Sequence, residues 1–287
     1  MKSLYDISAP AKLNLFLHIT GRRSDGYHLL QSVFMLIDWC DTLHFDLRTD
    51  GIISREDLGP PLPLDDLIVR AARALKAASS SPLGVHIGIE KRIPAQAGMG
   101  GGSSDAASTL LALNQLWKLD FSLEKLSRIG LQLGADVPFF LGGQNAWVEG
   151  IGEIMTPLSL PKSRVLVVKP EDGLDTKLIF SNSELKRDTE TAIISGFAAD
   201  IFGFGQNDLQ SVAQTLCPGI NQALNWLEAQ GLSGRMTGSG SAVFAHMLHD
   251  VDLASAPNAF RIRLCSSLDE HPLKSWASSG SLSVNSF

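Results

Sequence analysis

The fold is decided by the stretch Ala97-Gly98-Met99-Gly100-Gly101-Gly102-Ser103-Ser104-Asp105, in which glycine fills four of the five positions from 98 to 102. An alternating run, Val85 to Ile89, precedes it, and the residues from Ala106 to Trp117 form a broad apolar stripe without Gly or Pro. This pattern predicts a strand, a glycine-rich loop and a helix that begins at the loop. Backbone N–H groups that no side chain obstructs, next to the positive end of a helix, bind phosphates. We therefore interpret the stretch as a phosphate-binding loop.

The glycine loop differs from the two commonest nucleotide-binding motifs. No Lys-Ser or Lys-Thr pair follows the glycines, as it would in a P-loop, and Ser103 stands where G-x-G-x-x-G has its last glycine. A tight strand-to-helix connection would explain one or two glycines. Each glycine costs about 0.5–1 kcal/mol relative to alanine in regular structure. Four of them therefore favour a bound phosphate over a purely structural turn.

Two charged residues elsewhere are candidates for phosphoryl transfer, which needs cations that spread charge and a group that takes or orients the hydroxyl proton. Asp136 lies at a turn between apolar segments, either as a functional carboxylate or as the N-cap of a helix that begins near Pro138. Lys12 lies in an alternating run from Ala11 to Ile19, either at a solvated sheet edge or facing a polar cleft. Asn14 lies on the same face of this predicted strand as Lys12. If Lys12 and Asp136 meet, the ammonium keeps the carboxylate ionised and stabilises developing negative charge.

The length of 287 residues suits two modest domains or one large one. A passage marked by prolines, Thr156 to Pro161, precedes a buried strand predicted for Arg164 to Pro170. We therefore place a domain boundary near residue 160. This predicts an N-terminal domain of residues 1–160 with the phosphate loop and a C-terminal α+β domain of residues 161–287.

Further elements follow from local signals. Ser122 is a predicted helix N-cap, and a short amphipathic helix is predicted from Ile220 to Gln230. A second glycine-rich loop, Arg235 to Ser241, leads into an apolar strand, Ala242 to Ala245. The serine-rich tail after Trp276 is predicted to be peripheral.

Composition excludes several classes of function. The formal net charge is −6 and no basic run interleaves with aromatic residues, so we expect no nucleic-acid surface. The three cysteines lack the spacing of a metal or redox site, which favours reduced thiols. No signal peptide and no apolar window long enough to span a membrane is present, so we expect a cytoplasmic protein. The oligomeric state cannot be predicted.

Six motifs stand in order between about Ile7 and Ala245. They are Pro10-Ala11-Lys12-Leu13-Asn14-Leu15, Asp25-Gly26-Tyr27-His28, the loop from Pro94 to Ser104, Gly134-Ala135-Asp136-Val137-Pro138, Gln206-Asn207-Asp208-Leu209 and Arg235-Met236-Thr237-Gly238-Ser239-Gly240. Together they resemble the motifs of the galactokinase–homoserine kinase–mevalonate kinase (GHMP) superfamily. Within it, the chain is similar to the kinases that act on 4-diphosphocytidyl-2-C-methyl-D-erythritol in the non-mevalonate isoprenoid pathway.

The resemblance implies an α+β, two-domain GHMP-kinase fold with the active site in the cleft between the domains. It implies transfer of phosphate from ATP to the 2-hydroxyl of the cytidyl substrate, giving the 2-phosphate and ADP. It also implies Mg²⁺ with the ATP, for which no residue is assigned as a metal ligand. The residues that would hold the ATP phosphates are Pro94, Ala95, Gln96, Ala97, Gly98, Met99, Gly100, Gly101, Gly102, Ser103 and Ser104.

The resemblance also assigns roles to single residues. Asp136 matches the catalytic base and Lys12 its partner. Tyr27 and His28 match positions that recognise cytosine, by stacking and by hydrogen bonding to the base edge, which suits their chemistry. Phe180 matches an aromatic residue on the other face of the base, and Thr176 and Asn14 match polar positions near the substrate. The sequence departs from the family pattern at Gln144-Asn145 and in the segment after Ala245, and neither region contains one of these assigned residues.

Two alternatives remain open. One is a homoserine or mevalonate-type kinase with the same loop, against which Tyr27 and His28 argue, because a small aliphatic acceptor offers no base to stack. The other is a binding protein that keeps the nucleotide fold without catalysis, since a fold alone does not determine function. Retention of Lys12, Asp136 and the full loop argues against this second alternative.

Overall fold

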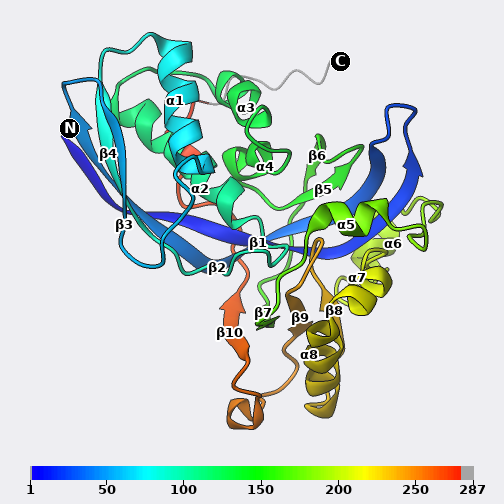
Figure 1. Ribbon diagram of the computed structural model, residues 1–287. Coiled ribbons are helices and arrows are strands. Elements are labelled where there is room, and N and C mark those ends of the chain that lie inside the picture. Colours follow the sequence, from blue (N-terminus) through cyan, green and yellow to red (C-terminus); the bar gives the residue numbers. More distant parts are fainter. Residues whose placement is uncertain (1, 279–287) are drawn as a thin grey trace.

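Two long strands form the backbone of the first sheet in the computed structural model, which describes residues 2–278 (Figure 1). β1 (Ser3–Arg22) and β2 (His28–Arg48) pair antiparallel and cross the molecule from one side to the other. The strands of this sheet lie in the order β3-β4-β2-β5-β6, and β1 pairs with β2 outside this order. Four shorter strands thus complete the sheet. They are β3 (Ile53–Asp57), β4 (Gly84–Glu90), β5 (Ala146–Glu149) and β6 (Ile154–Pro157).

Register shifts in β1 decide where its side chains point. Strict alternation was expected from Ala11 to Ile19, but the register shifts between Asn14 and Leu17. Ala11, Leu13 and Leu15 therefore pack in one apolar cluster, whereas Leu17 and Ile19 pack in another. A bulge of this kind re-aims the side chains that follow it.

Four helices cover one face of the first sheet (Figure 1). α2 begins inside the glycine run, as predicted, and packs against β1, α1, α3 and α4. Its buried side chains join those of β2 and α1 in the largest apolar cluster. Ser122 caps the third helix by accepting a hydrogen bond from Lys125 N, which confirms the predicted N-cap. The helices are α1 (Leu67–Ser79), α2 (Gly101–Leu116), α3 (Leu123–Leu131) and α4 (Val137–Gly142).

The second sheet has four strands in the order β10-β7-β9-β8. The predicted buried strand is confirmed, because β7 spans Arg164–Pro170 and lies between two neighbours. The helix predicted from residue 220 begins two residues earlier, with Pro218 in its first turn. The remaining elements are β8 (Gly234–Met236), β9 (Val243–His246), β10 (Phe260–Ser266), α5 (Thr176–Ser181), α6 (Ile194–Ala199), α7 (Gln210–Leu216), α8 (Pro218–Ala229) and the 3₁₀ turns Leu253–Ser255 and Lys274–Trp276.

The two sheets meet over an apolar cluster that combines β1 residues with Val165 and Val167 of β7 and Phe244 of β9. After β10 the chain returns to the first sheet, where Leu268 N donates to Leu36 O at 2.8 Å. The boundary near residue 160 falls between β6 and β7 and stays a prediction. The tail after Trp276 lies largely outside the described residues, from 279 onward. None of the helices within residues 2–278 is long and apolar enough to cross a membrane.

Candidate active site

A cavity of about 1740 Å³ collects almost all of the predicted site residues. It is lined by the glycine loop, by β1, by the turn before α4, by α5 and by the second glycine-rich loop. Ser104 is the exception, because its side chain is fully buried and is absent from the lining among the described residues. The predicted residues that line the cavity are Lys12, Asn14, Tyr27, His28, Asp136, Thr176, Phe180 and residues 94–103.

The glycine loop is held by close backbone approaches that only glycine allows. Gly98 has φ +71°, and a Cβ there would lie 2.2 Å from the carbonyl oxygen of Thr237 in the second glycine-rich loop. Gly100 has φ +69° and forms the N-cap of α2. Lys12 N donates to Met99 O at 3.0 Å, which ties the loop to β1. Two of the glycines are thus required by the fold itself.

The start of α2 faces the cavity. The first N–H groups of an α-helix have no partner within the helix and carry its positive end. Gly101, Gly102 and Ser103 provide these groups and line the cavity. The glycine loop can therefore bind a phosphate chain through backbone N–H groups.

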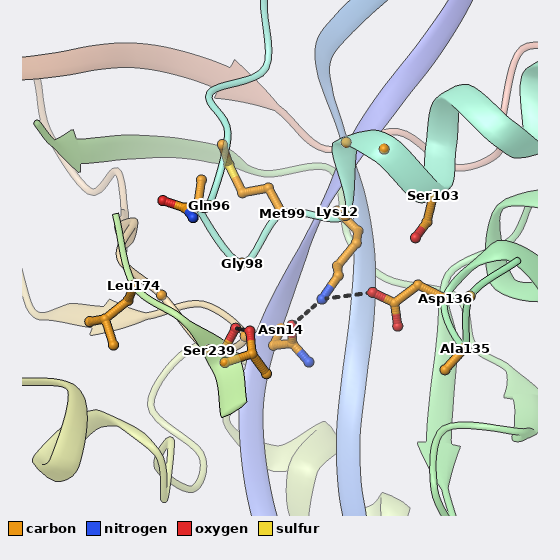
Figure 2. Close-up of a pocket in the computed structure, with 18 of the residues that line it drawn as sticks. Lys12, Asn14, Gln96, Gly98, Met99, Ser103, Ala135, Asp136, Leu174 and Ser239 are labelled. Atoms are coloured by element: carbon orange, nitrogen blue, oxygen red, sulfur yellow. Dashed lines mark hydrogen bonds and ion pairs between the residues drawn. The ribbon is translucent and has the colours of Figure 1, made fainter. Parts of the chain in front are cut away.

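Lys12 and Asp136 meet in the middle of the cavity, which the sequence could not establish (Figure 2). Lys12 Nζ lies 3.7 Å from Asp136 Oδ2, and the Lys12 residue is 4% exposed. The solvated-edge alternative for Lys12 is therefore wrong. Burial lowers the pKa of the Lys12 ammonium, although the Asp136 carboxylate works against this shift.

Asp136 occupies the N-cap position of α4, yet its side chain makes no capping hydrogen bond within the described residues. Its backbone is already helical, at φ −82° and ψ −12°, and the carboxylate points toward Lys12. A capping side chain instead accepts a hydrogen bond from the first turn. The carboxylate is therefore directed toward Lys12 and does not cap the first turn of α4.

Asn14 orients the lysine. Lys12 Nζ donates to Asn14 Oδ1 at 2.5 Å, and Asn14 Nδ2 donates to Ser32 Oγ at 2.8 Å. Asn14 N also donates to Thr237 Oγ1 at 2.8 Å. Both amide atoms of Asn14 are thus engaged within the protein, and its predicted contact with a substrate stays a prediction.

Tyr27, His28 and Phe180 line the cavity from the turn between β1 and β2 and from α5, which lie on the same side of the molecule (Figure 1). Tyr27 follows the tight turn between β1 and β2 and is 61% exposed. The His28 and Phe180 rings lie 5.0 Å apart between centroids. Arg187 Nε donates to His28 Nε2 at 3.1 Å, so the ring proton of neutral His28 lies on Nδ1. Burial, Arg187 and Arg22 all lower the pKa of His28, which favours this neutral form.

Thr176 begins α5 at the same end of the cavity. Its hydroxyl lies 2.7 Å from the hydroxyl of Ser239 in the second glycine-rich loop. Figure 2 shows Ser239 across the cavity from Asp136. Sequence reasoning missed Ser239, although it lay in a motif that had been singled out.

Sequence reasoning also missed a buried ion cluster beside the glycine loop. Lys91 Nζ lies 2.6 Å from Asp105 Oδ2 and also contacts Asp41, which is fully buried on β2. Asp41 Oδ1 accepts from the backbone N–H groups of Arg92 and Ile93. Burial raises the pKa of the Asp105 carboxyl, whereas the neighbouring Lys91 ammonium lowers it. Local sequence could not reveal this cluster, because its members are up to 64 residues apart.

The chain matches the two parts of a known kinase family. Residues 66–144 match the GHMP kinases N terminal domain, and residues 191–264 match the GHMP kinases C terminal domain. A curated 4-diphosphocytidyl-2-C-methyl-D-erythritol kinase from Albidiferax ferrireducens is 80% identical over 286 residues, covering 100% of both chains. This chain belongs to the 4-diphosphocytidyl-2-C-methyl-D-erythritol kinase family. This membership confirms the predicted family and the prediction that the protein is an ATP-dependent kinase.

Solved structures agree with this membership of the 4-diphosphocytidyl-2-C-methyl-D-erythritol kinase family. A crystal structure of 4-(cytidine 5'-diphospho)-2C-methyl-D-erythritol kinase is 31% identical, has a TM-score of 0.77 and covers 92% of this chain and 98% of its own. A homoserine kinase from Cytophaga hutchinsonii is 14% identical, with a TM-score of 0.67 and coverage of 94% and 96%, and so shares the fold alone. The predicted α+β GHMP-kinase fold is confirmed.

Proposed function

We propose that this protein transfers the γ-phosphoryl group of ATP to the 2-hydroxyl of 4-diphosphocytidyl-2-C-methyl-D-erythritol, giving the 2-phosphate and ADP. This reaction belongs to the non-mevalonate route to isoprenoid precursors. The observation that carries the proposal is the Lys12–Asp136 pair, 3.7 Å apart between a phosphate loop and an aromatic cluster. Full-length identity to family members of the same name supports the choice of acceptor.

The proposed reaction needs one proton acceptor and one electrostatic stabiliser. The Asp136 carboxylate takes the proton of the 2-hydroxyl as its oxygen bonds to the γ-phosphorus, and the bond from that phosphorus to the β-phosphate oxygen breaks. The Lys12 ammonium faces the negative charge that develops on the transferring group. The N–H groups of Gly101 and Gly102 hold the phosphates of the donor.

Aromatic residues would select the acceptor in this proposal. Tyr27 stacks on the cytosine, and Phe180 closes its other face. His28 donates from Nδ1 to an acceptor on the base edge, which its neutral form allows. Thr176 contacts the polar part of the same molecule. These roles are supported by the common position of the four side chains at one end of the cavity.

Mg²⁺ fits the proposed site as a companion of ATP. Mg²⁺ usually keeps several of its water ligands and binds through the phosphate oxygens of a nucleotide, so it would need few protein ligands here. Among residues 2–278, no group of three His, Cys, Asp or Glu side chains could hold a metal ion. Ser104 has a buried hydroxyl without a hydrogen-bond partner among the described residues, at the first turn of α2, but it does not line the cavity, so no protein residue is assigned as a ligand of the ion. When bound, the ion neutralises charge on the phosphate oxygens.

The proposal includes a cytoplasmic location. It is supported by the three free thiols of Cys40, Cys217 and Cys265, because a reducing compartment keeps thiols unpaired. No partner is proposed beyond the small-molecule substrates.

The test is release of ADP by the purified protein with Mg-ATP. The cytidyl substrate is compared with homoserine, with mevalonate and with no acceptor. We expect turnover with the cytidyl substrate alone. Release of ADP with another acceptor would overturn the substrate while keeping the kinase, and nucleotide binding without any turnover would favour the binding-protein alternative.

A further inference from the structure

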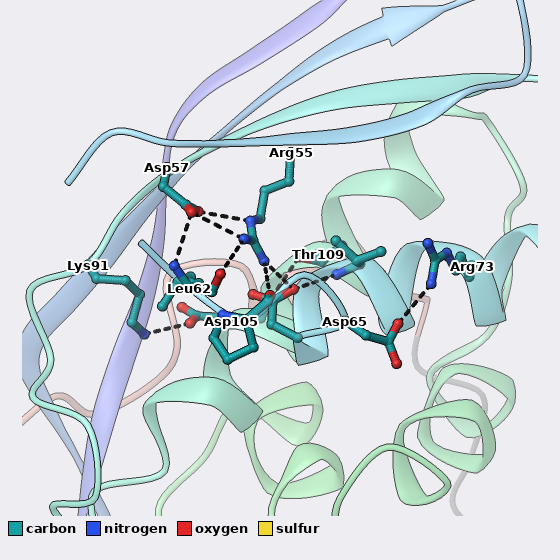
Figure 3. A network of polar contacts seen from close by, with 11 residues as sticks. Arg55, Asp57, Leu62, Asp65, Arg73, Lys91, Asp105 and Thr109 are labelled. Carbon is teal, nitrogen blue, oxygen red and sulfur yellow. Dashed lines mark hydrogen bonds and ion pairs between the residues drawn. The ribbon is translucent and has the colours of Figure 1, made fainter. Parts of the chain in front are cut away.

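One buried arginine beside the cavity has no part in the proposed reaction. Arg55 lies on the edge strand β3, and its side chain is 7% exposed. Its Nε lies 2.8 Å from Asp57 Oδ1, and its Nη2 donates to Asp57 Oδ2 at 3.2 Å. Its Nη1 lies 2.9 Å from Asp66 Oδ1, as Figure 3 shows for the network around it. A guanidinium held on several sides in this way has a fixed position.

Arg55 fastens the segment of residues 58–66, which joins β3 to α1. The carbonyl oxygens of Leu62 and Pro63 accept from Arg55 at 3.2 and 3.0 Å. Asp57 Oδ2 also accepts from Leu62 N at 3.0 Å. The segment contains three prolines, at positions 60, 61 and 63, which provide no N–H for backbone pairing. Arg55 and Asp57 therefore replace the missing backbone hydrogen bonds.

The far end of this segment forms a wall of the cavity. Leu62, Asp66, Leu67 and Ile68 line it, next to Lys91. Asp66 also caps α1, because its Oδ1 accepts from Val69 N at 3.1 Å. The same carboxylate thus joins the arginine, the helix and the cavity wall.

The position of this wall relates it to the donor. The glycine loop binds phosphates, and the reacting phosphate lies at Asp136, with the aromatic residues for the acceptor on one side of it. The remainder of the donor must then extend from the glycine loop toward α1, which lies on the other side of the molecule from α5 (Figure 1). On this side Leu67 lies beside Gly102, with its Cδ1 3.4 Å from the position that a Cβ of residue 102 would take, and residues 62 and 66–68 line the cavity. A nucleoside that leaves the glycine loop in this direction lies against the segment that Arg55 fastens.

We propose that Arg55 is a positioning residue for the phosphoryl donor, which acts by holding residues 58–66 as the wall against which the nucleoside of ATP lies. This inference rests on the proposed function for the identity of the donor. If the wall is in its binding position for only a fraction of the time, the apparent Kd for the nucleotide equals the intrinsic Kd divided by that fraction. Loss of the fork of hydrogen bonds would therefore weaken ATP binding without altering the transfer step.

The test compares Arg55→Lys with Arg73→Lys. Lysine keeps the charge but cannot reproduce the fork of the guanidinium. Arg73 is a matched control, because it pairs with Asp65 of the same segment at 2.8 Å, but both side chains are more than 60% exposed, at 61% and 66%. The readouts are the Kd for Mg-ATP by titration calorimetry without acceptor, and kcat and both KM values.

We expect Arg55→Lys to raise the Kd and the KM for ATP about tenfold, which corresponds to a binding competence of about one tenth. The kcat at saturating ATP and the KM for the cytidyl substrate should stay within twofold of the wild type, and Arg73→Lys should change nothing. Unchanged ATP affinity in Arg55→Lys would overturn the inference, as would an equal loss of affinity for donor and acceptor.

A second variant covers the case in which Arg55→Lys does not fold. Asp57→Asn removes one of the two carboxylate charges that Arg55 contacts and leaves the arginine and Asp66 in place, so we expect a rise of about threefold in the Kd for Mg-ATP. Wild-type affinity in this variant would then overturn the inference. A wild-type protein that binds no ATP would overturn the proposed function as well, whereas ATP binding without turnover would leave the role of Arg55 standing.

Discussion

The two ends of the cavity are built in opposite ways. The donor end is the part of the cavity lined by the glycine loop and by residues 62 and 66–68. It rests on α1 and α2, of 13 and 16 residues, and on the ion pairs of Lys91 with Asp41 and Asp105, whose side chains are at most 3% exposed. The acceptor end is the part of the cavity lined by Tyr27, His28, Thr176 and Phe180. It rests on the β1–β2 turn, which carries the exposed Arg23–Asp25 pair, and on α5, which has six residues. Buried charge pairs hold a geometry firmly when they are satisfied, whereas short exposed elements have few contacts that resist local opening.

This difference suggests a division of labour. In the proposed reaction, the donor end would present a preformed phosphate site, because its glycine loop is fixed by close contacts between backbones. The acceptor end would present aromatic surfaces that adjust when a ligand binds. Lys12 and Asp136 lie where the two ends meet, and changes there should affect turnover rather than binding.

The largest effect is expected at the junction of the two ends. Asp136→Asn keeps the shape of the side chain but removes the proton acceptor, so kcat should fall about 10²–10⁴-fold, the usual contribution of general base catalysis. Steady-state kinetics measure this fall, and a thermal unfolding midpoint equal to that of the wild type controls for folding. Turnover near the wild-type rate would remove Asp136 from the mechanism.

A change at the donor end should cost both stability and ATP affinity. Gly98→Ala places a Cβ 2.2 Å from Thr237 O at φ +71°, and a side chain in that backbone region costs about 1–3 kcal/mol before the clash is added. Thermal unfolding and Mg-ATP titration measure the two losses. Gly142→Ala is the control, because an added Cβ there meets nothing within 4 Å among the described residues. Similar behaviour of the two variants would refute the claim of a rigid donor loop.

A change at the acceptor end should spare the donor. Tyr27→Ala removes a stacking surface, and base stacking on an aromatic side chain contributes about 1–3 kcal/mol. The KM for the cytidyl substrate should therefore rise about 5- to 150-fold, while the KM for ATP and the unfolding midpoint should change little, since Tyr27 is exposed. Parallel rises in both KM values would show that Tyr27 supports the structure instead.

The smallest effect concerns the charge of Lys12. Its pKa lies below the ordinary lysine value of 10.5, so its ammonium should lose its proton at a lower pH than an exposed lysine does. The charged form is complete well below this lowered pKa and is lost as the pH rises through it. A profile of kcat against pH should consequently decline before pH 10.5. A flat profile up to that pH would show that transfer does not depend on this charge.

The sequence predicted the donor end better than the acceptor end for a physical reason. Gly98, Gly100 and the helix that follows are contiguous, and their backbone requirements are visible in the residue types. Lys12 and Asp136 could be proposed singly, but their meeting depends on how β1 and α4 both pack against α2. The contacts of Lys91 with Asp41 and Asp105 join segments up to 64 residues apart, so no local pattern marks them.

The residues of the acceptor end were predicted from the family resemblance, and no hydrophobic periodicity indicated them. Tyr27 and Phe180 are 153 positions apart, and nothing in either neighbourhood predicts that they share a cavity. The face of β1 that presents Lys12 was predicted correctly, whereas the register shift after Asn14 was not, because a bulge leaves no clear mark in an apolar run.

The most direct test of the account is phosphorus NMR of the product formed from Mg-ATP and the cytidyl substrate. We predict one new phosphomonoester signal on the sugar alcohol, with the signals of its diphosphate retained and ADP formed in equal amount. Formation of ADP with inorganic phosphate alone, or transfer to another position of the substrate, would contradict the assignment of Lys12 and Asp136 to phosphorylation of the 2-hydroxyl.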